Sequence, residues 1–447
     1  MTVTRTGYLV DSSHQNIQQI KKELTVRPQV NGDYGFPPPP FKVFKSTKNG
    51  ICVPRFYGID VLGAPTQDKR PEPVRIKTKF VGKLRDETSQ NEAHRSAIEA
   101  GSGVLSLPCG YGKTTVSLAI ACTLGYRTMI VVHKQFLADQ WRERIQQFCP
   151  GATIGVVQRD RKETECDFVI AMLQSLSLKE YNFNDFDTIG TVIVDEGHHI
   201  CAKVFSQSLF KMCPRHIFGL SATPERKDGL TKVLHWFMGP TFFSVERKEQ
   251  NQVDVFIVKY ESPNYRQPPP SMRNGKISMP NMITEIVEDR ERNKMLVELV
   301  KKASAGTRQL LVLSDRRQHC EFLHQCFPTT SGLYMGGMKE ADLQASSVKK
   351  IIFATFSQAH EGLDIPTLDT VILASPKSDI TQSIGRIMRE TKGKKNNPQI
   401  YDIHDPWSLF TPMYYKRRKV YRQGGFNIRG GEEEAPSSHI PQGKCLF

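Results

Sequence analysis

The feature that most constrains the fold is a regular alternation of short apolar runs with helix-forming segments. Runs rich in β-branched residues lie at 104–109, 128–133, 152–157, 167–173, 191–196 and 216–222. Each is short enough for a parallel strand that is buried on both faces. Between two of these runs, one helical face carries apolar residues at spacings of four, four and three, namely Leu137, Trp141, Ile145 and Phe148. Alternating strands and helices predict a doubly wound α/β sheet.

The alternation stops near residue 245 and then resumes. Residues 246–281 contain prolines, glycines and charged residues in a pattern typical of a linker. A predicted helix over 282–304 follows, and further apolar runs lie at 309–314, 331–336, 349–356, 369–375 and 398–403. We therefore expect these segments in order: an N-terminal accessory domain of mixed or β character with a possible role in nucleic-acid binding (1–80), an α/β domain (81–245), a linker (246–281), a second α/β domain (282–410) and a basic tail (411–447).

Composition excludes several classes of protein. The 447 residues are 38% hydrophobic and 24% charged, which is typical of globular domains and excludes a mainly disordered chain. The sequence has no apolar run near the ~18 residues of a membrane-spanning helix. The ten cysteines are scattered without a CxxC pair, which indicates reduced thiols instead of a disulfide frame or a zinc site. With no secretory signal at its start, we expect a soluble intracellular protein, in the cytoplasm or the nucleus.

A glycine-rich turn joins the run 104–109 to a helical segment. The turn is Gly110-Tyr111-Gly112-Lys113-Thr114-Thr115, and it presents backbone N–H groups and a helix N-terminus to a phosphate. Lys113 then reaches the β- and γ-phosphates of a nucleotide, and the Thr114 hydroxyl ligates Mg²⁺. Because Leu107 stands where the common form of this motif has glycine, a plain helix-capping turn stays open as an alternative.

Two carboxylates follow another buried run. Asp195 and Glu196 come directly after 191–194, and Asp195 lies 82 positions after Lys113. A carboxylate here holds Mg²⁺ through the water shell of the ion, and Glu196 orients or deprotonates the water that attacks the γ-phosphate. The neighbouring His198 and His199 carry no zinc prediction, since Cys201 is the one cysteine close to them and no further group of cysteines or histidines lies near them in the sequence. The two motifs together predict a nucleoside triphosphatase that uses Mg²⁺.

The order of these and later motifs resembles that of the superfamily 2 helicases and translocases of the DExH type. The resemblance covers about 84–407, and its further motifs are Leu137…Gln140-Trp141, 172–176, 219–224, 354–366 and 382–389. It implies two tandem RecA-like P-loop domains with ATP and Mg²⁺ between them. It also implies that nucleic acid is held across both domains and moved by hydrolysis.

The resemblance further implies roles for individual residues. Catalytic roles fall to Asp195, Glu196, Gln382, Arg386 and Arg389. Nucleotide binding falls to Gln90, which reads adenine, and to Gly110, Gly112, Lys113, Thr114, Thr115, Gly362 and Asp364, with Thr114 and Asp195 also on Mg²⁺. Contact with nucleic acid, or its coupling to hydrolysis, falls to Gln140, Trp141, Gln174, Ser221, Thr223 and Arg226. Arg386 and Arg389 are three apart on a predicted helix, so they share a face from which at least one offsets charge on the γ-phosphate.

Finer features are similar to the xeroderma pigmentosum group B branch, which includes a phage recombination helicase and the helicases of large DNA viruses. They are 221–229, Gly239-Pro240 and 289–293, and 53–58 resembles the module that precedes the motor in viral members. The resemblance implies a viral, monomeric ATP-dependent helicase on DNA more than RNA, without a membrane. A duplex translocase that does not separate strands, an RNA helicase, and a nucleic-acid-binding scaffold with a nucleotide switch stay open.

The net charge of +15 indicates a polyanionic partner or only a soluble surface. Under the motor interpretation, part of the excess lines a phosphate-binding track. Its candidate members are 69–83, Lys392, Lys394, Lys395 and the basic residues of 416–429.

Overall fold

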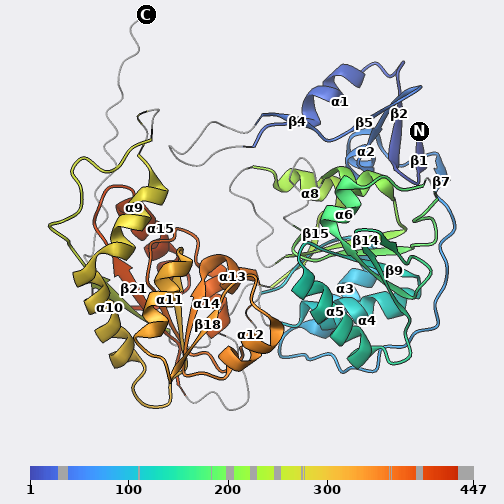
Figure 1. Ribbon diagram of the computed structural model, residues 1–447. Coiled ribbons are helices and arrows are strands. Elements are labelled where there is room, and N and C mark those ends of the chain that lie inside the picture. The colour runs from blue at the N-terminus through green and yellow to red at the C-terminus, as the bar shows by residue number, and fades with distance from the viewer. Residues whose placement is uncertain are drawn as a thin grey trace, which may run out of the picture. The chain divides into compact units, whose positions relative to one another are not determined.

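The computed structural model describes residues 1–28, 39–108, 111–182, 184–197, 206–221, 229–245, 253–272, 275, 277–361, 363, 365–388 and 396–430. The chain divides into two compact units, Met1–Arg247 and Lys248–Phe447. Figure 1 shows the helices and strands of both. The predicted class of two tandem α/β units on parallel sheets is confirmed.

The N-terminal module, residues 1–69, is a small sheet with two helices. Its strands run in the order β5-β6-β2-β1-β7, with β1 and β7 parallel and the other pairs antiparallel. Their bounds are β1 Thr2–Thr4, β2 Gly7–Asp11, β5 Lys45–Thr47, β6 Gly50–Val53 and β7 Gln67–Lys69; β3 Thr25–Val26 pairs with β4 Phe41–Lys42, and the helices are α1 Ile17–Glu23 and α2 Arg55–Leu62.

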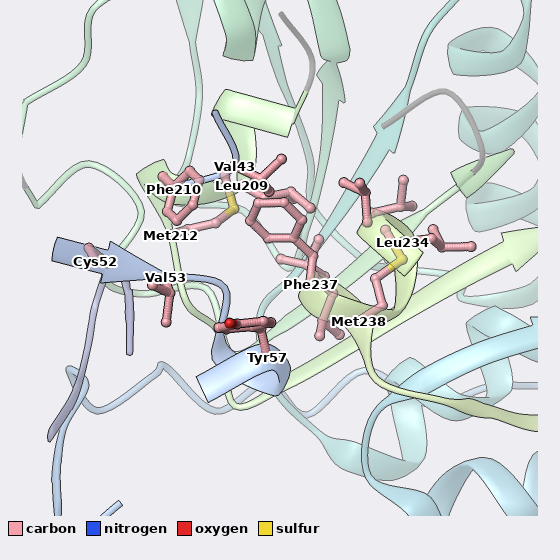
Figure 2. Close-up of a cluster of buried hydrophobic side chains, with 14 of the residues drawn as sticks. Val43, Cys52, Val53, Tyr57, Leu209, Phe210, Met212, Leu234, Phe237 and Met238 are labelled. Atoms are coloured by element: carbon pink, nitrogen blue, oxygen red, sulfur yellow. The ribbon is translucent and has the colours of Figure 1, made fainter. Parts of the chain in front are cut away.

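The N-terminal module shares a hydrophobic core with the rest of the first unit. Figure 2 shows side chains of the module, among them Val53 and Tyr57, in one cluster with Phe210 and Phe237. Arg55 is 8% exposed, and its guanidinium donates to the carbonyl of Pro214 at 2.7 Å and to Ser102 Oγ at 3.0 Å. The segment 53–58 therefore fastens the module to the first α/β sheet.

The first α/β sheet has eight strands in the order β11-β10-β12-β9-β13-β14-β8-β15. All pairs are parallel except that of β11 with β10. The six predicted strands are confirmed, and the structure adds β11 and β15. The bounds are β8 Gly103–Ser106, β9 Thr128–Val132, β10 Ile154–Gln158, β11 Arg161–Lys162, β12 Phe168–Met172, β13 Thr191–Val194, β14 His216–Ser221 and β15 Thr241–Ser244.

Successive residues of these strands point to two separate cores. Ile193 on β13 packs with the helices α3 Gln90–Ala100, α4 Lys113–Leu124 and α5 Gln135–Phe148. Its neighbours Val192 and Val194 pack on the other face, with α6 Leu173–Leu178, the 3₁₀ helix Gln207–Lys211 and α8 Thr231–Met238. Because both faces are covered, the central strands are mainly apolar, which is why the sequence shows them as continuous runs.

The basic stretch 69–83 contacts this sheet at the amino ends of its strands. Val74 and Ile76 exchange backbone hydrogen bonds with Arg127 and Gly125, just before β9, and Thr78 donates to Asp167, just before β12. These contacts are at the amino ends of the strands. Lys113 and Asp195 follow the carboxyl ends of β8 and β13, so this stretch lies at the opposite edge from them, and its membership of the phosphate track stays a prediction.

The second unit is built on seven parallel strands in the order β18-β19-β17-β20-β21-β16-β22. The five predicted runs are confirmed as β17 Leu310–Ser314, β18 Ser331–Tyr334, β19 Ile351–Thr355, β20 Thr370–Leu373 and β21 Gln399–His404. The helices are α9 Met279–Glu288, α10 Arg290–Ala303, α11 Arg317–Gln325, α12 Glu340–Ser347, α13 Phe356–Glu361, α14 Thr381–Ile387 and α15 Phe410–Gln423. The segment 246–281, expected as a linker, differs in containing β16 Asp254–Lys259, which pairs with β21 and with β22 Asn427–Arg429.

The single helix predicted over 282–304 is two helices. Asp289 separates α9 from α10 with an extended ψ of 113°, and its carboxylate accepts a hydrogen bond from the backbone N–H of Arg292. An aspartate in this position caps the new helix. The cap turns Arg292 into the core, where it is 0% exposed and donates to both oxygens of Asp405 at 2.7 and 2.8 Å.

Two arginines of the predicted basic tail are structural. On α15, Arg417 and Arg418 are 1% and 7% exposed. The guanidinium of Arg417 pairs with Asp402 at 2.7 Å, and Tyr421 donates to the same carboxylate. These two arginines cannot belong to a phosphate track at the surface. Lys392, Lys394 and Lys395 lie outside the described residues.

Candidate functional site

The turn that leads into α4 depends on glycine at position 112. Gly112 caps the helix with φ of +78°, a left-handed conformation that other residues rarely adopt. A Cβ there would also lie 2.5 Å from Nε2 of Gln90. Lys113, Thr114 and Thr115 form the first turn of α4, whose backbone N–H groups and dipole favour an anion. Gly110 lies outside the described residues.

The buried side chain of Gln90 stabilises this turn through hydrogen bonds to the backbone. It is 1% exposed, its Oε1 accepts from the backbone N–H of Arg85 at 3.0 Å, and its Nε2 donates to the carbonyl of Tyr111 at 2.8 Å. The amide therefore joins the backbone just before α3 to the backbone of the turn. The predicted contact of Gln90 with adenine stays a prediction.

The two carboxylates lie beside the lysine of the turn. Lys113 Nζ is 3.9 Å from Glu196 Oε1, and it donates to the carbonyl of Leu107 at 3.4 Å. Glu196 has φ of +49°, a strained conformation of the kind that accumulates at functional sites. Burial, followed by the neighbouring charge of Glu196, raises the pKa of Asp195 to about 6. The N–H of Trp141 and the charge of Lys113 act in the opposite direction.

Trp141, predicted to contact nucleic acid or to couple it to hydrolysis, lies in the core beside Asp195. It is 1% exposed, so it cannot contact nucleic acid directly, and its indole N–H donates to Asp195 Oδ2 at 2.9 Å. The apolar spacing along α5 already indicated that Trp141 belongs to the core face. Gln140, the preceding residue, is partly exposed.

Two other residues expected to contact nucleic acid or to couple it to hydrolysis, Gln174 and Ser221, lie at the same edge of the sheet. Gln174 is exposed on α6 and donates to the carbonyl of His133, just after β9. Ser221 ends β14 and is 0% exposed, so it lies inside the protein at this edge and not on its surface. Thr223 and Arg226 lie outside the described residues.

In the second unit, the structure locates part of the predicted arginine motif. Gln382 and Arg386 stand on α14, which ends at Ile387, and only their backbone is described. Arg389, like Gly362 and Asp364, lies outside the described residues. Their predicted roles toward the nucleotide stay predictions.

Comparison with known proteins decides the family. A mimivirus protein (Acanthamoeba polyphaga mimivirus) named "Putative ATP-dependent RNA helicase L396" is 34% identical over 453 residues, which are 96% of this chain and 86% of that protein. The family described as "Type III restriction enzyme, res subunit" matches residues 83–226. The chain belongs to the superfamily 2 helicases.

A second viral relative agrees with this family. "Putative helicase 161L" of Invertebrate iridescent virus 6 is 31% identical to this helicase over 396 residues, 81% of this chain and 86% of the relative. The crystal structure of T4 UvsW covers 96% of this helicase and 99% of its own chain, at 16% identity and a TM-score of 0.37. The fold is established by the two parallel sheets and not by that superposition. As a member of the family, this helicase is an ATP-hydrolysing enzyme that acts on nucleic acid.

The helicase has a hollow in its second unit that the sequence did not predict. About 320 Å³ in volume, it lies where the parallel strands end, and it is lined by Asp315, Arg317, Gly336, Thr355, Phe356, Ser357 and Lys377. Asp315 follows β17, Thr355 ends β19, and Lys377 comes shortly after β20. The signal that could have found it is the pair Arg316-Arg317 directly after a buried run, at the edge where α/β proteins bind ligands.

No helix within the described parts of the helicase is both long and apolar enough to span a bilayer.

Proposed function

We propose that this helicase hydrolyses ATP at the carboxyl edge of its first α/β sheet and uses the energy to translocate on DNA and separate its strands. The observation that carries the proposal is the meeting of two distant motifs. The lysine that begins α4 and the acidic pair after β13 come within 3.9 Å, between Lys113 Nζ and Glu196 Oε1. Carboxyl ends of parallel strands, next to a helix N-terminus, are where α/β proteins bind phosphates.

The proposed roles follow from this arrangement. Lys113 exchanges its bonds with Glu196 and Leu107 for the β- and γ-phosphates, whose charge exceeds that of one carboxylate. Glu196 is then available to orient and deprotonate the attacking water. Gly110, Gly112 and Thr115 complete the phosphate cradle, and Gln90 keeps its turn in place while it faces the adenine side.

Mg²⁺ fits the residues present. Asp195 and Thr114 offer a carboxylate and a hydroxyl oxygen, the hard ligands that this ion prefers. The raised pKa of Asp195 also fits, because a nearby cation stabilises the charged form of a carboxylate that its surroundings otherwise destabilise. When bound, the ion would neutralise charge on the phosphates.

We assign the remaining nucleotide contacts to the second unit on its sequence motifs. Arg386 and Arg389 are the candidates to offset charge at the γ-phosphate, with Gln382 beside them. Gly362 and Asp364 are candidates to sense the nucleotide. Hydrolysis would then require residues of both units, which is how a two-domain motor makes turnover depend on its conformation.

The hollow of the second unit is proposed as part of the nucleic-acid track. Arg317 and Lys377 are cationic, and Thr355 and Ser357 bring hydroxyls 3.4 Å apart. Arginine, lysine and hydroxyl side chains are the groups that contact phosphate and sugar. In the first unit, the exposed Gln174 and the partly exposed Gln140 are the candidates for contact.

Removing the two cations of the hollow tests this track. The double variant Arg317→Ala, Lys377→Ala should bind duplex DNA more weakly, and the slope of log affinity against log salt should become less steep by about 2, since each phosphate contact contributes roughly 0.9. Fluorescence anisotropy across a salt series measures both. Lys294→Ala, Lys301→Ala, which removes two exposed lysines of α10, is the control. If the two double variants show equal slopes of log affinity against log salt, the hollow is not part of the nucleic-acid track.

DNA is proposed over RNA because 221–229, 239–240 and 289–293 resemble the xeroderma pigmentosum group B branch. A specific rival is supported by the name of the mimivirus relative, which is called an RNA helicase. A second rival is a duplex translocase. Strand displacement on DNA and RNA substrates, beside displacement of a triplex strand, separates the three. Release only from the triplex would favour the translocase, and release only from RNA would overturn the choice of DNA.

A further inference from the structure

We propose that Trp141 is a positioning residue that holds the Asp195 carboxylate in the orientation that binds the divalent cation. The inference rests on the proposed function, and it adds to it a residue that does not touch nucleotide or metal itself. Of the two roles that the resemblance implies for Trp141, it excludes direct contact with nucleic acid and leaves coupling as a prediction.

The first step is the geometry of the contact. Trp141 lies in the middle of α5, and Asp195 lies 54 residues later, after β13. The indole Nε1 donates to Asp195 Oδ2 at 2.9 Å, and Trp141 is 1% exposed. An indole N–H is a donor only, so this contact cannot reverse its direction.

The second step is what the indole does to the carboxylate. The backbone N–H of Glu196 donates to Asp195 Oδ1 at 3.0 Å, so each oxygen receives one hydrogen bond. A carboxylate has about four lone-pair sites, so two donors fix its plane and still leave sites for a metal or its water. Donors of this kind fix the orientation of metal-binding groups, and their loss typically weakens metal binding by about 10–100-fold.

The third step is the rigidity of the support. The indole is packed on the face of α5 that also buries Ile145, against the same core as Ile193 of β13. The helix begins directly after β9, the strand next to β13 in the sheet. A side chain locked in this way adds little motion of its own, so the position of α5 sets the position of the carboxylate.

The test compares Trp141→Phe with two matched variants. Ile145→Val trims the same face of α5 without touching Asp195, and Trp407→Phe removes the other buried indole that donates a hydrogen bond, to the carbonyl of Arg266 in the second unit. Binding of Mn²⁺ to the ADP-loaded full-length protein is measured by electron paramagnetic resonance. Binding of ADP in EDTA is measured separately by calorimetry.

We expect Trp141→Phe to weaken Mn²⁺ binding by about 10–100-fold, to keep ADP binding in EDTA, and to recover ATP hydrolysis as Mg²⁺ is raised. The two matched variants should bind Mn²⁺ like the wild type. Unchanged Mn²⁺ binding in Trp141→Phe, while the wild type binds the ion normally, would overturn this inference alone. A wild-type protein that binds neither ADP nor Mn²⁺ would overturn the proposed function together with it.

A measurement on the unaltered side chain covers the case in which Trp141→Phe does not fold. The chain has three tryptophans, so its indole N–H resonances can be assigned with Trp236→Phe and Trp407→Phe. Addition of Mg²⁺ to the ADP-loaded protein should shift the resonance of Trp141 and leave the other two in place, since only its acceptor binds the ion. A resonance of Trp141 that stays in place would contradict the proposal.

Discussion

Glu196→Gln is expected to lower the rate of ATP hydrolysis by about 10²–10⁴-fold, the usual contribution of a general base, while the protein still binds ATP. The amide keeps the size of the side chain but cannot take a proton from the attacking water. Release of phosphate in the presence of DNA measures turnover, and a fluorescent ATP analogue measures binding.

Glu99→Gln is the matched control, because Glu99 is exposed near the far end of α3 from the turn that holds Lys113. This control should hydrolyse ATP like the wild type. Lys113→Ala should also lose hydrolysis, but through the loss of phosphate binding and not of the base. Turnover of Glu196→Gln close to that of Glu99→Gln would remove Glu196 from the role of base.

Arg292→Leu is expected to destabilise the second unit by about 3–5 kcal/mol, the usual cost of removing one partner from a buried ion pair. The change leaves the fully buried Asp405 with a hydrogen bond from the hydroxyl of Tyr265, and it also removes a hydrogen bond of 2.9 Å from Arg292 to the carbonyl of Ala374. For a unit of about 200 residues this corresponds to a fall in Tm of roughly 6–20 °C. Differential scanning calorimetry of the full chain measures it.

Arg290→Leu provides the control within the same motif. Arg290 begins α10 and is exposed, so its loss should change stability by less than about 0.5 kcal/mol. Adding Asp405→Leu to Arg292→Leu should restore part of the stability, because the double change leaves no unpaired buried charge. Equal effects of Arg290→Leu and Arg292→Leu would show that the buried pair does not stabilise this unit.

The central strands of both sheets were predictable because they are buried on two faces. Ile193 packs in one core and its neighbours Val192 and Val194 pack in the other, so all three positions of β13 require apolar side chains. The edge strands carry no such signal. The three residues of β22 pair only with β16, and β16 itself follows a polar segment, so pairing in the folded sheet and not local composition defines both.

The P-loop turn and the acidic pair were also predictable, because their chemistry requires those residue types next to those strands. The partner of Asp195 was not. The periodicity of α5 places Trp141 on the core face, but only the fold brings an indole N–H from one element to a carboxylate 54 residues away. The burial of Arg417 was not predicted either. Its charge suggested an exposed position, but its spacing from Tyr414 and Tyr421 places it on the buried face of α15.

The central claim is that ATP hydrolysis at the first sheet is coupled to nucleic acid. Its most direct test is a side-by-side titration of ATPase activity with single-stranded DNA, duplex DNA and RNA, on the wild type and on Arg317→Ala, Lys377→Ala. We expect DNA to stimulate the wild type strongly and RNA to stimulate it less, while the double variant needs more DNA for the same turnover. Turnover that none of the three nucleic acids changes would contradict the account of this helicase as a motor.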